Sequence, residues 1–153
     1  MNKVRKVLKP TKARIKFVND SQSGQIVRAL EVENELRHFA SSSKAKILMR
    51  FFKTQKGEYG YGDRFLGVMV PQVRALAKKY NELSLEECEV LLGSPYNEAR
   101  LLALCILVSQ FKNGGPQDRQ RIFNLYKQNL DRINNWNLVD SSAHEIVGGF
   151  LFD

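Results

Sequence analysis

The chain has 153 residues, which is enough for one domain with a hydrophobic core of ordinary size. With 43% hydrophobic and 26% charged residues, its composition is that of a globular protein and not of a disordered one. The formal net charge is +8, but residues 1–20 carry seven basic side chains against one acidic side chain, so +6 of that charge belongs to them. We therefore expect residues 1–20 to be a flexible basic arm, which could either bind phosphates or be a disordered tail. The nearly balanced charge of the remaining chain gives little support for a polyanion site on the folded body.

Cysteine and hydropathy patterns exclude several other classes of protein. Cys88 and Cys105 form no CxxC pair and the chain has only two histidines, so we predict no metal site, no disulfide and no other cofactor. No run of about 18 apolar residues occurs, so no membrane-spanning helix is expected. These patterns favour a protein of the reducing cytoplasm.

Apolar residues recur at helical spacing along most of the chain and predict a series of helices. The predicted helices cover residues 25–40, a short segment that ends by Lys53, residues 71–80, 85–92, 96–111 and 117–128, and a last segment that carries Trp136. Ser84 opens a capping box for one helix, and we expect Asp131 to cap the last segment. The helix over residues 96–111 is apolar almost all round, which predicts that it is central.

Residues 54–70 form the main irregular stretch, in which three glycines alternate with Tyr59 and Tyr61. Such a loop could bring backbone N–H groups close to a phosphate, although no P-loop lysine and serine follow. The alternative is a plain connection whose aromatic side chains tuck onto neighbouring helices, and the spacing favours this second interpretation.

No segment shows the alternating pattern of a strand ladder, so we predict an all-α fold. Helices of about 10–17 residues joined by short breaks indicate antiparallel helix pairs. Residues 85–111 contain a short helix, a Ser-Pro turn and a long helix, which is typical of one unit of a HEAT-like α-solenoid. We therefore predict that residues 21–153 form a right-handed α-α superhelix, whose concave side could hold a nucleic acid duplex.

The only tryptophan, Trp136, and the carboxylate of Asp140 are four residues apart in the last predicted helix. At that spacing they share one face, about one turn apart. An indole beside a carboxylate suits chemistry that holds a sugar while positive charge develops on it. Two simpler alternatives remain open: Trp136 could belong to the core, and Asp140 could be a cap or a solvated charge.

Four segments, spread over residues 45–150, resemble the bacterial AlkD-type DNA alkylation repair glycosylases, a HEAT-like helical family. These segments are KTQKGEYG at residues 53–60, FLGV at 65–68 with Pro71 and Arg74, the Ser-Pro pair at 94–95 with EARLLAL at 98–104, and NWNLVD at 135–140. The combination of the FLGV and NWNLVD motifs is more specific than either motif alone.

This resemblance implies an enzyme that hydrolyses the N-glycosidic bond of cationic alkylated purines, such as 3-methyladenine and 7-methylguanine, in double-stranded DNA of the bacterial nucleoid. The family is known for doing so without flipping the base, unlike most glycosylases. Its active-site tryptophan and aspartate fall on Trp136 and Asp140. By this resemblance the carboxylate stabilises an oxocarbenium-like sugar and the attacking water, while the indole holds the sugar.

Other side chains are candidates for contact with DNA. Arg50, Lys53, Lys56 and Arg74 could reach phosphates that flank the lesion. Phe51 falls where some family members carry a tyrosine near the lesion, and it lacks the hydroxyl group.

The chain also departs from the family pattern. The family takes an active-site arginine from a later helical repeat, whereas this sequence ends at Asp153. We therefore expect that arginine to be absent, the domain to be truncated and an apolar repeat face to be left uncapped, with poor solubility or self-association as the result. The family often has Asp where Asn137 stands. A non-catalytic helical-repeat module that binds DNA or another protein is the alternative function.

Overall fold

The computed structural model describes residues 27–152, so the predicted basic arm lies outside the described residues. The described chain is helical, with one isolated bridge between Arg64 and Tyr96 in place of a sheet. Its elements are α1 (Ala29–Arg37), α2 (Ser42–Phe51), α3 (Val70–Lys79), α4 (Leu85–Leu92), α5 (Asn97–Asn113), α6 (Pro116–Gln128), the 3₁₀ turn η1 (Leu130–Arg132), α7 (Trp136–Ala143), the π-helical segment η2 (His144–Gly148) and α8 (Gly149–Phe152). The prediction of an all-α fold is confirmed.

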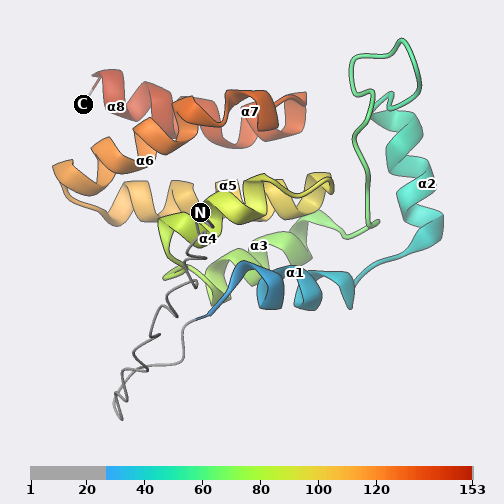
Figure 1. The fold of residues 1–153 in the computed structure, drawn as a ribbon, viewed down its shortest axis with the longest axis horizontal. Coiled ribbons are helices and arrows are strands. Elements are labelled where there is room, and N and C mark those ends of the chain that lie inside the picture. The colour runs from blue at the N-terminus through green and yellow to red at the C-terminus, as the bar shows by residue number, and fades with distance from the viewer. Residues whose placement is uncertain (1–26, 153) are drawn as a thin grey trace, which may run out of the picture.

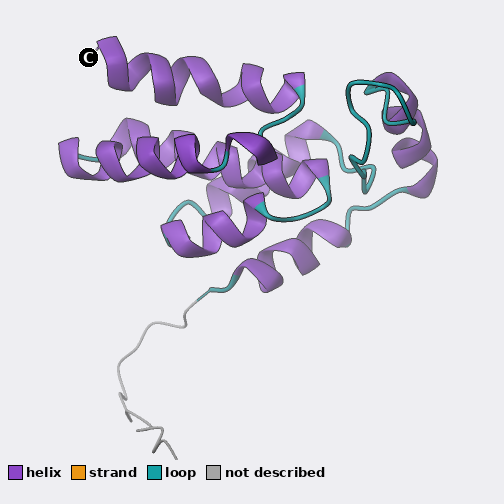
Figure 2. Ribbon diagram, turned by 45° about the horizontal axis from the view of Figure 1, so that its top comes forward, coloured by secondary structure: helices purple, strands orange, loops and turns teal. Residues whose placement is uncertain are grey.

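Helix α5 lies at the centre of a solenoid-like stack (Figure 1). It packs against α3 and α4 on one side and against α6 and α7 on the other, while α1 covers α3 and α4. Leu102, Ile106 and Leu107 of α5 are fully buried, as its uniformly apolar sequence predicts. Figure 2 shows that α7, η2 and α8 continue one another as a single long helix along the outer edge.

Helix α2 stands apart from this stack, at the edge of the molecule (Figures 1 and 2). It packs on a small apolar cluster of its own, formed by Ala45, Phe52 and Phe65, and not on the main core. The backbone N–H of Ser41 donates to the carbonyl oxygen of Leu66 at 2.9 Å and ties the start of α2 to the FLGV segment. The aromatic cluster is therefore what fixes the far end of this helix.

Gly67 of the FLGV motif permits this attachment. Its φ of +81° lies in the left-handed region, and a Cβ atom there would lie 2.1 Å from the carbonyl oxygen of Ser41 and 2.7 Å from the backbone nitrogen of Ala45. Only glycine avoids both the strain and the collision. The glycine of the motif is therefore a requirement of helix packing.

Glu98, in the first turn of α5, holds the same segment from the other side. Its buried carboxylate accepts the backbone N–H groups of Leu66, Gly67 and Val68 at distances between 2.8 and 3.2 Å. These hydrogen bonds replace the hydration that the carboxylate loses on burial. The FLGV motif and the EARLLAL motif are thus two halves of one contact.

The start of α7 differs from the sequence prediction. Asn135 is the N-cap, and its side-chain oxygen accepts the backbone N–H of Trp136 at 2.8 Å. The expectation that Asp131 caps this segment is wrong, because Asp131 belongs to the separate turn η1. The chain leaves that turn before the helix begins at Trp136, which places Asp131 too early to reach the free N–H groups of the first turn.

Candidate functional site

A cavity of about 320 Å³ lies between α2, α3, α5 and the first turns of α7. Four residues that the sequence singled out line it together: Phe51, Arg74, Trp136 and Asp140. They come from three helices, α2, α3 and α7, so the fold assembles residues that are up to 89 positions apart in the chain. The predicted pairing of an indole and a carboxylate on one face of a helix is present here.

A stack of aromatic rings supports the indole of Trp136. Phe52 lies between Trp136 and Phe65, with ring centroids 5.1 Å and 4.9 Å away and interplanar angles of 28° and 14°. Phe51 approaches Trp136 edge-on, with centroids 6.0 Å apart. Trp136 nevertheless keeps 45% of its surface exposed, so the interpretation of it as an enclosed core residue is excluded. The stack holds an indole that remains open to a ligand.

The Asp140 side chain is exposed and lines the cavity. It makes no hydrogen bond or ion pair with any residue of the described part of the chain, and it does not cap a helix. One turn of α7 separates it from Trp136, as the spacing predicts. Its carboxylate is therefore available to a ligand in the cavity.

Asp63 behaves in the opposite way, although no motif in the sequence marks it as a site residue. It is buried and forms an ion pair of 2.6 Å with Arg100, while Asn97 and Asn135 donate side-chain hydrogen bonds to its second oxygen at 3.3 and 3.0 Å. Burial raises the pKa of Asp63, but the hydrogen bonds from Asn135 and Arg100 and the positive charge of Arg100 outweigh burial and hold that pKa below its usual value. Asp63 is a structural anion.

This network orients the helix that carries the site. Asn135 is both a donor to Asp63 and the N-cap of α7, so the buried ion pair fixes where Trp136 begins the helix. Asn137 adds a reciprocal amide pair with Asn97, in which each side chain donates to the other at 3.2 and 2.7 Å. Asn137 therefore joins α7 to α5.

A second cavity of about 700 Å³ continues the first one along α3, α5 and α7. The two cavities share Arg74, Cys105, Asp140 and Ser141, and the second adds the cations Lys78 and Lys112, which we add to the predicted basic residues. We call the two together the groove. Asp140 stands at the junction of the apolar cavity with the more polar and basic one, which suits a ligand with both apolar and anionic parts. Burial raises the pKa of the Cys105 thiol, while the charge of Arg74 opposes this rise.

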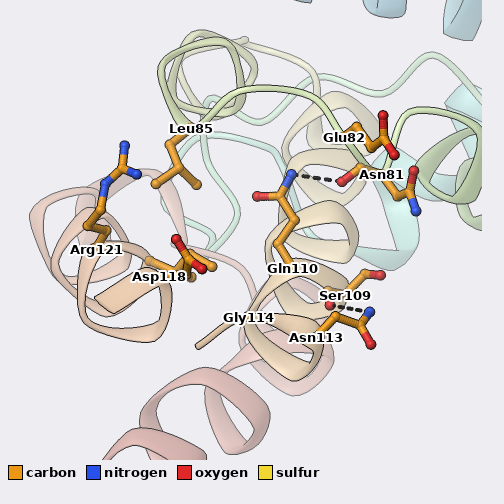
Figure 3. Close-up of a pocket in the computed structure, with 10 residues that line it drawn as sticks. Asn81, Glu82, Leu85, Ser109, Gln110, Asn113, Gly114, Asp118 and Arg121 are labelled. Carbon is orange, nitrogen blue, oxygen red and sulfur yellow. Dashed lines mark hydrogen bonds between the residues drawn. The ribbon is translucent and has the colours of Figure 1, made fainter. Parts of the chain in front are cut away.

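A third cavity, of about 360 Å³, borders the second one near Asn81 and Ser109 (Figure 3). Its central side chain, Gln110, donates to the carbonyl oxygens of Asn81 and Leu83 at 2.8 and 2.7 Å. These bonds secure the connection between α3 and α4 against α5. None of the sequence-predicted site residues lines this cavity.

The remaining predicted DNA-binding residues lie outside the groove lining. Arg50 lies in the last turn of α2, and Lys53 and Lys56 follow the helix in the loop; all three are exposed. Their contact with DNA stays a prediction. The expectation that the loop tyrosines tuck onto neighbouring helices is wrong, because Tyr59 and Tyr61 are 57% and 64% exposed. Phe65 is the aromatic residue of this stretch that packs inward.

Among residues 27–152 no group of three or more histidine, cysteine, aspartate or glutamate side chains is arranged to hold a metal ion. In the same residues none of the helices combines the length and the hydropathy needed to cross a membrane.

The fold and the groove define a solenoid-like all-α protein with an open groove that joins an aromatic stack to a free carboxylate. A family model described as DNA alkylation repair enzyme matches residues 32–153. The chain belongs to this family, which confirms the resemblance seen in its motifs. Neither the curated proteins nor the solved structures include a match to the chain.

Proposed function

We propose that this protein is a DNA glycosylase that excises cationic alkylated purines, such as 3-methyladenine and 7-methylguanine, by hydrolysing the N-glycosidic bond. One observation carries the proposal: the unpartnered carboxylate of Asp140 and the half-exposed indole of Trp136 stand one helical turn apart in a single groove. Membership of the DNA alkylation repair family supplies the class of substrate. The carboxylate, the indole and the cations of the groove support the assignment of glycosidic bond hydrolysis.

The reaction does not require protonation of the base, but it does require stabilisation of positive charge on the sugar. An alkylated purine of this kind is already cationic, so the bond between C1′ and the base nitrogen breaks with its electron pair leaving on a neutral base. The sugar gains oxocarbenium character, as in glycoside hydrolysis. The Asp140 carboxylate stabilises this positive charge and orients a water molecule, whose oxygen bonds to C1′ and whose proton the carboxylate accepts.

Trp136 is assigned the role of holding the deoxyribose. Its exposed face offers a flat apolar surface, and its other contacts, with Phe52 and Phe51, keep the ring in place. A rigid plate one turn from Asp140 fixes the distance between carboxylate and sugar before the reaction begins. The exposed Phe51, which also lines the cavity, is assigned a contact with the same nucleotide.

The cations of the groove are assigned to the phosphates. Arg74 lines both cavities next to Asp140, and Lys78 lines the second one. Lys112 also lines the second cavity, where Glu145 pairs with it at 2.7 Å. The exposed Arg50, Lys53 and Lys56 extend this set beyond the groove. In this proposal the helix stack is a HEAT-like repeat whose groove side faces double-stranded DNA.

The test is release of 7-methylguanine from methylated duplex DNA, followed by chromatography, for the protein and for Asp140→Asn. We expect the variant to lose on the order of 10²–10³ in single-turnover rate, which is the usual cost of one preorganised electrostatic group. Asp131→Asn is the matched control, because Asp131 is exposed in η1 and lies outside the groove lining. Equal release by the Asp140→Asn variant would remove Asp140 from the mechanism. DNA binding without any release by the unaltered protein would favour a non-catalytic binding module.

A further inference from the structure

The loop between α2 and α3 presents two exposed tyrosines. Residues 53–64, which we call the tyrosine loop, extend beyond α2 at the edge of the molecule (Figure 1). The side chains of Tyr59 and Tyr61 are more than half exposed, and their hydroxyl groups make no hydrogen bond within the described residues. Two large apolar rings exposed within three residues of one loop favour a surface that contacts a ligand.

Backbone hydrogen bonds give the loop a defined shape. The N–H of Gly60 donates to the carbonyl oxygen of Lys53 at 3.0 Å, and the N–H of Tyr61 donates to that of Glu58 at 3.2 Å. A Cβ atom at Gly60 would lie 2.3 Å from the carbonyl oxygen of Phe52, so only glycine can follow this path. The rings are therefore held by a preorganised backbone, which lowers the entropy cost of binding.

Hydrogen bonds through Asp63 and Asn135 join the loop to the groove. Asp63, near the end of the loop, accepts a hydrogen bond from Asn135, and Asn135 caps the helix that begins with Trp136. The side chain of Asn135 also packs close to Gly60, because a Cβ atom at position 60 would lie 3.3 Å from the amide nitrogen of Asn135. The backbone of the loop that carries the two tyrosines is thus tied to the start of α7 through buried contacts.

Three of the four exposed charged side chains of the loop are basic, and Glu58 is the acidic one. Lys53, Lys56 and Arg64 are exposed, whereas Asp63 is buried in its ion pair. The carboxylate of Glu58 accepts the backbone N–H of Gln55 at 2.9 Å. Flat aromatic rings among exposed cations match a ligand with flat faces and phosphates, which is the chemistry of nucleobases on a nucleic acid strand.

We propose that the tyrosine loop is a second DNA-binding site, in which Tyr59 and Tyr61 stack on an unpaired nucleobase while the cations beside them contact its phosphates. The proposal rests on the proposed function in one respect only, that the groove holds DNA. It does not depend on base excision.

The test compares binding of two fluorescent duplexes of one sequence, one fully paired and one with a single bulged 2-aminopurine. For the Tyr59→Ala/Tyr61→Ala variant we expect affinity for the bulged duplex to fall on the order of 10- to 100-fold, because one base loses its aromatic partner. Quenching of the 2-aminopurine by the unaltered protein should disappear in this variant. The matched Tyr59→Phe/Tyr61→Phe variant keeps the rings and should keep both properties.

A second arm separates stacking from charge. Lys53→Ala/Lys56→Ala should weaken binding to both duplexes and reduce the dependence of log affinity on log salt by about two, one for each phosphate contact. Unchanged quenching and affinity in the double alanine variant of the tyrosines would overturn the proposal while leaving base release by Asp140 intact. Loss of release in Asp140→Asn together with normal quenching would support the loop and the active site as separate functions.

Discussion

The buried pair of Asp63 and Arg100 permits a sharp test of how the groove is held. Asp63→Asn removes the negative charge that Arg100 meets at 2.6 Å and leaves that guanidinium, which is almost fully buried, without a counterion. The other acceptors of Arg100 are the carbonyl oxygen of Arg132 and the side chain of Asn134, at 3.1 and 3.0 Å, and the amide oxygen that Asp63→Asn introduces would be neutral as well. Because neutral oxygens do not replace a carboxylate, the variant should be strongly destabilised.

The expected loss is about 3–5 kcal/mol of unfolding free energy, the cost of stranding one partner of a buried pair. For a chain of 153 residues this corresponds to a fall in Tm of roughly 10 °C. Urea unfolding followed by Trp136 fluorescence measures both the stability and the setting of the indole. The double variant Asp63→Leu/Arg100→Met strands no charge and should recover the part of the loss that comes from the buried guanidinium, although the buried amide of Asn135 still loses its acceptor. A single variant within about 1 kcal/mol of the unaltered protein would refute this reasoning.

The same pair predicts the sign of a pH effect. The pKa of Asp63 is lower in the folded protein than its ordinary value of 3.8, despite burial, which raises it, because the contacts with Asn135 and Arg100 favour the anion. Its contribution to stability is therefore complete above that value and is lost as the pH falls through the lower folded pKa. Glu35 and Glu145 also have lowered pKa values, so the useful quantity is the difference between the protein and Asp63→Asn. That difference should narrow as the pH falls below about 4, and a constant difference would contradict the assignment.

Two further outcomes follow from local geometry. Gly67→Ala should cost more stability than Gly57→Ala by at least about 2 kcal/mol in chemical unfolding, because both positions have positive φ but only Gly67 has backbone atoms within 3 Å of the new Cβ. Equal losses of stability would show that backbone strain, and not packing, is the reason for glycine at position 67. The partly exposed thiol of Cys105 should react slowly with a disulfide reagent near neutral pH and faster as the pH rises. Its reaction should be slower when DNA fills the groove. Burial raises the pKa of Cys88 to about 12, so Cys88 should react only on unfolding. A rate for Cys105 that DNA leaves unchanged would place the nucleic acid elsewhere.

Local patterns predicted the helices well because helix formation depends on neighbours in the chain. The uniform apolarity of α5 identified it as central, and the four-residue spacing of Trp136 and Asp140 placed them on one face. The wrong prediction that Asp131 caps α7 has the same origin. Any nearby polar residue is a plausible cap on spacing alone, and the choice of Asn135 depends on its contact with the distant Asp63.

Long-range polar contacts could not be predicted in this way. Asp63 and Arg100 are 37 residues apart, and nothing in the local pattern of either shows which acid and which base are buried together. Glu98 was visible as part of a motif, but its role as an acceptor for the FLGV backbone depends on tertiary structure. Tyr59 and Tyr61 were misjudged because aromatic composition indicates burial only on average, and tertiary contacts decide each ring.

A comparison of Asp63, Glu98 and Asp140 shows why the chemistry of the groove can be tested separately from the stability of the fold. Asp63 and Glu98 are buried and fully engaged by the chain, so replacing either one must disturb the fold. Asp140 is exposed and contributes no hydrogen bond to the fold, so Asp140→Asn should alter the unfolding free energy by no more than about 0.5 kcal/mol. If Asp140→Asn abolishes base release at unchanged stability, the loss belongs to the reaction. If instead it unfolds the protein as readily as Asp63→Asn does, Asp140 supports the fold and the carboxylate of the reaction must be sought elsewhere.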